Sequence, residues 1–199
     1  MSPVDLPHAD LRTMRWNLPN ILTWLRIVAI PLVVLLFYMP NSWADPAAGL
    51  LFAAASITDS LDGYLARRMG LTSRLGAFLD PVADKLIVAV TLVLLVSKNP
   101  HWIVVISAAV IIGREIAISA LREWMAELGQ RTKVAVSSIG KYKTILQMVG
   151  LSMMLYRNPL LGLPVYELGI ALTILAAILT LMSMIMYLRA AWPTLKAAD

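Results

Sequence analysis

Six apolar stretches, separated by short polar segments, dominate the hydropathy pattern of the 199-residue chain. Most of them approach the roughly 20 residues that a helix needs to cross a bilayer; the fifth along the chain is shorter and weaker. The stretches cover residues 21–38, 47–65, 76–96, 102–121, 144–155 and 168–188. Prolines, which interrupt helices, fall between them at Pro40, Pro46, Pro100, Pro159 and Pro164. The pattern predicts an all-α, polytopic membrane protein, with a single domain over residues 1–199 built as a six-transmembrane-helix bundle.

The amino-acid composition supports a membrane protein and excludes other classes. Hydrophobic residues make up 59% of the chain and charged residues 15%, with a mean hydropathy of +0.75, whereas soluble domains average roughly 45–50% and about 25%. Because the chain has no cysteine, it forms neither a disulfide framework nor a thiolate metal site. Basic loops on the cytoplasmic side of a membrane protein account for the net charge of +5, so we expect no nucleic-acid partner.

The distribution of basic residues between the stretches predicts the orientation. Only Lys98 and Arg157 lie on one side of the membrane. Thirteen others lie on the opposite side: Arg12, Arg15, Arg26, Arg67, Arg68, Arg74, Arg122, Arg131, Lys133, Lys141, Lys143, Arg189 and Lys196. Since basic residues concentrate in cytoplasmic loops, both termini are predicted to be cytoplasmic, with residues 1–20 forming a cytoplasmic or interfacial segment.

An alternative interpretation of the first stretch is a cleaved signal peptide. Arg12 and Arg15 precede it, and residues 42–44 (Ser-Trp-Ala) loosely resemble a cleavage site. The stretch is long for such a peptide, however, and residues 17–20 (Asn-Leu-Pro-Asn) are typical of a helix start. These two features favour a membrane span.

Four carboxylates occur where a membrane helix least tolerates them. Asp59 and Asp62 lie near the end of the second stretch, and Asp80 and Asp84 near the start of the third. Spacings of three and four residues put each pair on one helix face, and the short connection makes the two helices antiparallel neighbours. Intramembrane charges are costly and mark functional sites. Four converging carboxylates need cations to remain ionised, and their oxygen ligands favour Mg²⁺.

The neighbouring residues indicate a crowded ligand site. The small residues Gly63, Ala66 and Gly76 allow close approach, while Arg67 and Arg74 are placed to hold phosphate oxygens. Cations, basic residues and apolar surroundings together suggest a phosphorylated substrate with a lipid tail. Two alternatives remain open: the carboxylates pair with basic residues as links between helices, or they form the acidic relay of an ion- or proton-coupled transporter. The chain lacks the internal repeats that many transporters show.

The spacing of the carboxylates and small residues resembles a family signature. Eight positions over 26 residues match that of the CDP-alcohol phosphotransferases: Asp59-x2-Asp62-Gly63-x2-Ala66-Arg67-x8-Gly76-x3-Asp80-x3-Asp84. Residues 17–26 resemble the opening of bacterial members, and residues 114–124 are similar to one branch, the phosphatidylglycerophosphate synthases. The likeness weakens near Pro159 and in the C-terminal tail.

The resemblance implies a fold, a reaction and roles for individual residues. The implied protein is a homodimer of six-helix bundles in the bacterial inner membrane, with an active site that faces the cytoplasm and opens sideways to lipid. It would transfer the phosphatidyl group of CDP-diacylglycerol to an alcohol and release CMP. Asp59, Asp62 and Asp80, joined by Asp84, would hold two Mg²⁺ ions, for which Mn²⁺ is an alternative, and Asp84 would also be the general base. The expected CDP-diacylglycerol contacts are Asn20, Thr23, Gly63, Arg67 and Ser73.

The acceptor alcohol is predicted from a basic cluster. Arg114 lies inside the fourth stretch, Arg122 lies roughly on the same helix face two turns later, and Lys141 and Lys143 precede the fifth stretch. Together they are expected to bind the phosphate of glycerol 3-phosphate. Inositol phosphate and phosphatidylglycerol remain alternative acceptors. Arg114 would otherwise form an ion pair with Glu115 or an aspartate, the lysines would be ordinary loop charges, and the segment 122–143 could form an interfacial helix.

Overall fold

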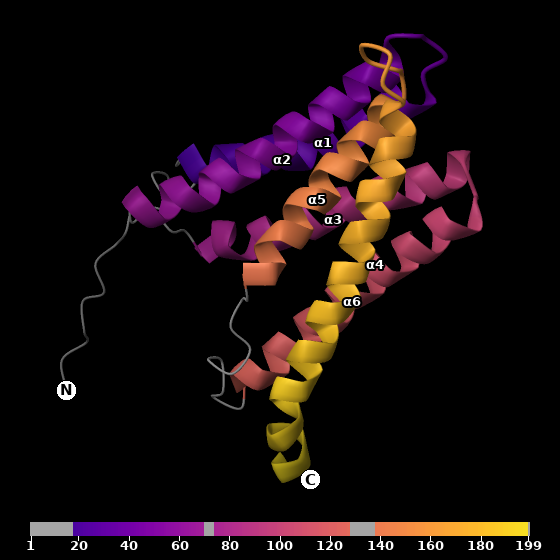
Figure 1. Ribbon diagram of the computed structural model, residues 1–199. Helices are drawn as coiled ribbons and strands as arrows, with labels where there is room; N and C mark the ends of the chain where they lie inside the picture. Colours follow the sequence, from indigo (N-terminus) through magenta and orange to yellow (C-terminus); the bar gives the residue numbers. More distant parts are fainter. Residues whose placement is uncertain (1–17, 70–73, 128–137, 199) are drawn as a thin grey trace, which may run out of the picture.

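The computed structural model describes residues 18–69, 74–127 and 138–198, with side chains described for 21–59, 78–127 and 142–192 (Figure 1). Every described stretch of regular structure is helical apart from one isolated bridge between Leu160 and Leu163. The helices are α1 (Leu18–Tyr38), α2 (Ala44–Met69), α3 (Arg74–Lys98), α4 (Trp102–Glu127), α5 (Ser138–Tyr156) and α6 (Val165–Ala198). Each predicted stretch lies within one helix, so the all-α prediction is confirmed.

Prolines set several helix boundaries. Helix α1 ends at Tyr38, two residues before Pro40, and α6 begins directly after Pro164. Pro31 and Pro81 instead lie inside α1 and α3, where each removes one backbone hydrogen bond. The interpretation of segment 122–143 as a separate interfacial helix is wrong for its first residues, because α4 continues without a break through Glu127.

The helices pack around one central apolar core to which all six contribute. Helix α1 packs against α2 and α3, α5 packs against α2 and α6, and the second contact of α6 is with α4. Phe52, Leu92, Leu95, Ile111 and Leu151 are among the large side chains fully buried in this core. A smaller cluster of Ile118, Met125, Tyr187 and Ala191 joins α4 to α6.

Glycines allow α5 and α6 to approach with their backbones nearly in contact. A Cβ atom on Gly150 would lie 2.6 Å from Thr173 Oγ1, and one on Gly169 would lie 2.8 Å from the carbonyl oxygen of Gly150. Such contacts are typical of membrane helices, where van der Waals packing replaces the hydrophobic driving force. They fix the position of α5 along α6.

Among the described residues, three helices are long and apolar enough to cross a membrane: α1 over Ile21–Tyr38, α4 over Trp102–Glu127 and α6 over Val165–Trp192. The outer surface of the bundle is also apolar. Leu25 is 57% exposed and Ile116 is 67% exposed. Exposed apolar surface on this scale is typical of a protein whose surroundings are lipid.

Candidate functional site

A pocket of about 490 Å³ brings the carboxylates and the basic residues of the sequence prediction together. It lies between the second half of α2, the first half of α3 and the second half of α4. We call this the site end of the bundle. The lining residues are Asp59, Asp80, Pro81, Asp84, Lys85, Arg114, Glu115, Ile118, Ser119, Arg122 and Glu123.

Side chains of helix α1 contact two of the three aspartates that line the pocket. The Arg26 guanidinium, 3% exposed, forms an ion pair with Asp59, with 2.7 Å between Nη1 and Oδ1. The hydroxyl of Thr23, one turn earlier, donates a hydrogen bond to Asp80. Both residues lie on the face of α1 that meets α2 and α3, so one helix face positions carboxylates from two others.

The oxygen atoms of the side chains that line the pocket are suitable ligands for a hard divalent cation. Its side-chain ligands are carboxylate oxygens, the type that Mg²⁺ and Mn²⁺ prefer, and neither histidine nor cysteine lines the pocket. Among the described residues, no three acidic, histidine or cysteine side chains lie close enough together to hold one ion. Arg26 and Thr23 instead engage Asp59 and Asp80. The side chain of Asp62 lies outside the described residues.

The opposite wall of the pocket carries buried positive charge. Arg114, 6% exposed, forms an ion pair with Glu115, and Lys143 of α5 approaches the same oxygen, with 3.2 Å between Nζ and Oε1. Lys143 is 5% exposed. The Nε atom of Arg114 is buried and has no hydrogen-bond partner among the described residues. One carboxylate therefore serves two buried cations.

An aromatic ring from α6 supports two of the arginines. The guanidinium carbons of Arg114 and Arg122 lie 5.9 Å and 5.5 Å from the centroid of the Tyr187 ring. Tyr187 is 6% exposed and packs with Ile118 and Met125. The prediction that the two arginines share a helix face is confirmed, because both lie over this ring.

The predicted site residues divide into those whose side chains are described and those whose side chains are not. Asp59, Asp80, Asp84, Arg114 and Arg122 line one pocket, Thr23 contacts it through Asp80, and Lys143 contacts it through Glu115. The following lie outside the described side chains: Asn20, Asp62, Gly63, Arg67 and Lys141, which are placed on helices, and Ser73, which is not described at all.

Sequence reasoning missed or misplaced three contacts. Arg26, which the orientation argument counted among the basic residues at the start of a span, is buried inside α1 and paired with Asp59. An arginine within an apolar stretch was the available signal. The pairing of Arg114 with Glu115 is confirmed. The second partner, Lys143, and the supporting ring of Tyr187 follow from how α4 packs near α5 and α6, which one sequence does not reveal.

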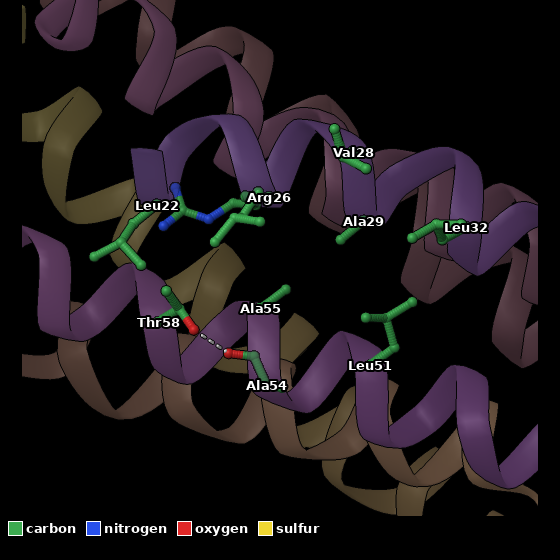
Figure 2. A pocket seen from close by; sticks show the side chains of 10 residues that line it. Leu22, Arg26, Val28, Ala29, Leu32, Leu51, Ala54, Ala55 and Thr58 are labelled. Carbon is green, nitrogen blue, oxygen red and sulfur yellow. Dashed lines mark hydrogen bonds between the residues drawn. The ribbon is translucent and has the colours of Figure 1, made fainter. Parts of the chain in front are cut away.

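An apolar pocket of about 260 Å³ lies between α1 and α2 beside the carboxylates. Figure 2 shows Arg26 and Leu22 at one end of it and Leu32 and Leu51 at the other. Apart from Arg26 and Thr58 its lining is aliphatic, and the Thr58 hydroxyl is satisfied by the carbonyl oxygen of Ala54 at 2.7 Å. Arg26 therefore lines this apolar pocket and also contacts a carboxylate of the charged pocket.

Comparison with known proteins identifies the family of the chain. The family model of the CDP-alcohol phosphatidyltransferases matches residues 16–192. A protein of Escherichia coli strain K12 and one of Shigella flexneri are each 53% identical to the chain over 178 residues, which is 89% of this chain and 96% of theirs. Both are named CDP-diacylglycerol–glycerol-3-phosphate 3-phosphatidyltransferase. The match spans all six helices and both walls of the pocket, and the chain belongs to the CDP-alcohol phosphatidyltransferase family.

Proposed function

We propose that the protein transfers the phosphatidyl group of CDP-diacylglycerol to glycerol 3-phosphate, giving phosphatidylglycerophosphate and CMP. The observation that carries this proposal is a pocket lined by carboxylates of α2 and α3 and by Arg114 and Arg122 of α4, with Lys143 of α5 paired to its lining residue Glu115. Such a pocket suits a cation-assisted reaction between two phosphorylated molecules. The names of the relatives, at 53% identity, support the same substrates.

The aspartates of α2 and α3 form the carboxylate wall of the pocket, which would bind the donor substrate CDP-diacylglycerol. Asp59, Asp62, Asp80 and Asp84 would bind two Mg²⁺ ions, or Mn²⁺ in their place. When bound, the ions supply positive charge against the pyrophosphate and the departing CMP. Asn20, Gly63, Arg67 and Ser73 would contact the CDP moiety, and Thr23 would act on it through Asp80, to which its hydroxyl donates.

The pocket between α1 and α2 would receive part of an acyl chain. It begins at Arg26, whose guanidinium joins the carboxylate wall through Asp59, and it continues along aliphatic side chains (Figure 2). A diacylglycerol donor needs this combination, because its charged headgroup and its apolar tail must be accommodated side by side.

The cation wall would bind the phosphate of the acceptor. Arg114, Arg122, Lys141 and Lys143 would supply charge-assisted hydrogen bonds to its oxygens. Glu115 pairs with both Arg114 and Lys143, and the bound phosphate would supply further negative charge to these two cations. The unpartnered Nε of Arg114 is a donor available to such an anion.

Transfer would then be a direct displacement. The acceptor hydroxyl attacks the β-phosphorus of CDP-diacylglycerol, a new oxygen–phosphorus bond forms, and the bond from that phosphorus to the oxygen of CMP breaks. Asp84 accepts the hydroxyl proton as general base and releases it to solvent, while CMP departs as the anion. No cysteine is present, and the mechanism requires no covalent intermediate.

The membrane arrangement is part of the proposal. Six spans, cytoplasmic termini and a site at the cytoplasmic face of the bacterial inner membrane would place the pocket where soluble glycerol 3-phosphate arrives. The single-domain organisation and the homodimer stay predictions.

The experiment is CMP release by the purified protein with CDP-diacylglycerol and Mg²⁺, across glycerol 3-phosphate, inositol phosphate, phosphatidylglycerol and no acceptor. We expect release only with glycerol 3-phosphate, its loss on chelation, and its recovery with Mg²⁺ or Mn²⁺. Release with another alcohol alone would replace the acceptor assignment. An absence of release with every acceptor would contradict the enzyme and favour an ion-coupled transporter.

A further inference from the structure

The turn between α5 and α6 exposes leucines at the end of the bundle opposite the site. Residues 159–164 read Pro-Leu-Leu-Gly-Leu-Pro. Leu160 is 51% exposed, Leu161 94% and Leu163 56%. Facing water, three such side chains would forgo burial worth roughly 1.5–3 kcal/mol each. A turn built for water would carry polar residues here, so its composition requires an explanation.

Most of the backbone N–H groups in this turn are paired within the turn or absent. Leu160 and Leu163 exchange backbone hydrogen bonds of 3.3 Å and 2.9 Å, and the N–H of Val165 donates to the carbonyl of Leu163 at 2.9 Å. The two prolines have no N–H group. Within residues 159–165, which are all described, only Leu161 and Gly162 at the tip have N–H groups without an intramolecular partner. Unpaired backbone groups are what a bilayer excludes most strongly.

The turn is also conformationally fixed. Leu161 and Gly162 have φ angles of 52° and 80°, in the left-handed region that a bulky residue such as leucine rarely adopts. The hydrogen bonds between Leu160 and Leu163 close the turn around them. The tip leucine is therefore held outward rather than folded back onto the protein.

The apolar surface of the turn continues that of the helices. Leu160 and Leu163 line an apolar pocket of about 300 Å³ with Leu50 of α2 and Leu168 of α6, and these helix residues are 63% and 41% exposed. Polar contacts flank the turn: the Arg157 guanidinium lies 5.2 Å from the Tyr166 ring centroid. Apolar residues inside a polar and aromatic belt are typical of a membrane boundary.

The position of the turn along α6 fits the thickness of a bilayer. From Val165, beside the turn, to Tyr187, at the site, α6 rises about 33 Å at 1.5 Å per residue. The hydrocarbon core of a bilayer is about 30 Å thick. When the site lies at one boundary of the membrane, the turn therefore lies at the other.

We propose that the turn 159–164 is a lipid anchor. Its leucines insert at the boundary between the ester groups and the acyl chains of the leaflet opposite the site, where the N–H groups of Leu161 and Gly162 meet ester carbonyls. The partner is the lipid layer itself. This inference rests on the membrane-spanning helices and does not depend on the proposed reaction.

The absence of cysteine from the chain makes the test direct, because Leu161→Cys introduces a single thiol. A nitroxide attached there, with the protein in lipid nanodiscs, reports collisions with oxygen, which is enriched in lipid, and with a water-soluble nickel chelate. We expect oxygen to dominate at position 161. Asn41→Cys, in the exposed α1–α2 connection at the same end, is the matched control, and there we expect nickel to dominate.

Two outcomes would overturn the proposal. Nickel accessibility at position 161 equal to that at 41 would place the turn in water. Protection from both reagents would indicate contact with protein, such as a second copy of the chain. Leu160→Cys provides a second label on the same turn should Leu161→Cys not yield a monodisperse protein, and its expected accessibility is the same.

Discussion

The two ends of the helix bundle use the same interactions for different purposes. At the end of the bundle that carries the α5–α6 turn, here called the turn end, Lys98 of α3 pairs with Asp45 of α2 at 3.1 Å. Arg157 lies over the ring of Tyr166 at the same end. At the site end, Arg114 and Lys143 share Glu115, and Tyr187 supports Arg114 in the same way. Both ends thus combine an ion pair with an arginine–tyrosine contact.

The two ends of the bundle differ in how deeply their ion pairs are buried and in the balance of charge around them. The side chain of Lys98 is 36% exposed, whereas those of Arg114 and Lys143 are each 6% exposed. An exposed pair contributes about 0–1 kcal/mol and costs little to form. Buried charges carry a desolvation penalty that apolar side chains would avoid, and around Glu115 the cations outnumber the anion. The site end therefore holds buried positive charge that Glu115 alone does not balance, at a cost in stability.

The largest expected effect is on the general base. Asp84→Asn removes the proton acceptor, and we expect the rate of CMP release to fall by roughly 10²–10⁴-fold. Asp45→Asn removes a carboxylate from the turn end and is the matched control, with release unchanged. Near-normal release from Asp84→Asn in a correctly folded sample would sink the catalytic assignment.

The next prediction compares how much the ion pairs of Glu115 and of Asp45 contribute to the free energy of unfolding. Glu115→Gln leaves Arg114 and Lys143 buried without an anion, so we expect the free energy of unfolding to fall by about 3 kcal/mol. Thermal unfolding in detergent measures this, and added glycerol 3-phosphate should restore part of the loss. Asp45→Asn should cost less than about 1 kcal/mol. Equal losses at the two ends would show that burial does not separate them.

The acceptor assignment predicts a selective kinetic effect. Arg114→Ala removes charged hydrogen bonds worth about 1.5–3 kcal/mol, so the KM for glycerol 3-phosphate should rise roughly tenfold to a hundredfold. The KM for CDP-diacylglycerol should change little, and Arg157→Ala should leave both values as they are. If Arg114→Ala raised both KM values equally, Arg114 would have no specific role toward the acceptor.

The smallest effect concerns the aromatic support. Tyr187→Leu removes a cation–π contact worth about 0.5–2 kcal/mol, so we expect a few-fold rise in the KM for glycerol 3-phosphate. Tyr187→Phe keeps the ring and should retain the original value. Tyr166→Leu makes the same change at the turn end and should leave the KM for glycerol 3-phosphate unchanged. A loss in Tyr187→Phe as large as in Tyr187→Leu would implicate the hydroxyl rather than the ring.

Local patterns in the sequence predicted the helices and one wall of the site. Apolar stretches, several of them bounded by prolines, located the described helices, because long apolar segments can be recognised without long-range contacts. The i, i+3 and i, i+4 spacings placed the aspartates on helix faces, and Asp59, Asp80 and Asp84 do line one pocket. Here the information lies within single helices and their short connections.

Contacts between distant helices were beyond that reasoning. In the sequence Arg26 is one more basic residue near the start of a span, and only the packing of α1 against α2 buries it on Asp59. Tyr187 is one aromatic residue in a long apolar helix, and it gains its role only because α6 crosses α4 at Arg114 and Arg122. The packing of helices remote in sequence decides such contacts, and no local spacing encodes it.

The length of α6 has a consequence for how the enzyme responds to its membrane. The apolar segment Val165–Trp192 has 28 residues, about 42 Å at 1.5 Å per residue, against a hydrocarbon core of about 30 Å. Such a helix must tilt or thicken the bilayer locally. Its far end carries Tyr187, which supports Arg114 and Arg122. With Arg114 and Arg122 binding the acceptor as proposed, hydrophobic mismatch would act on that site, and we expect the affinity for glycerol 3-phosphate to vary with acyl-chain length.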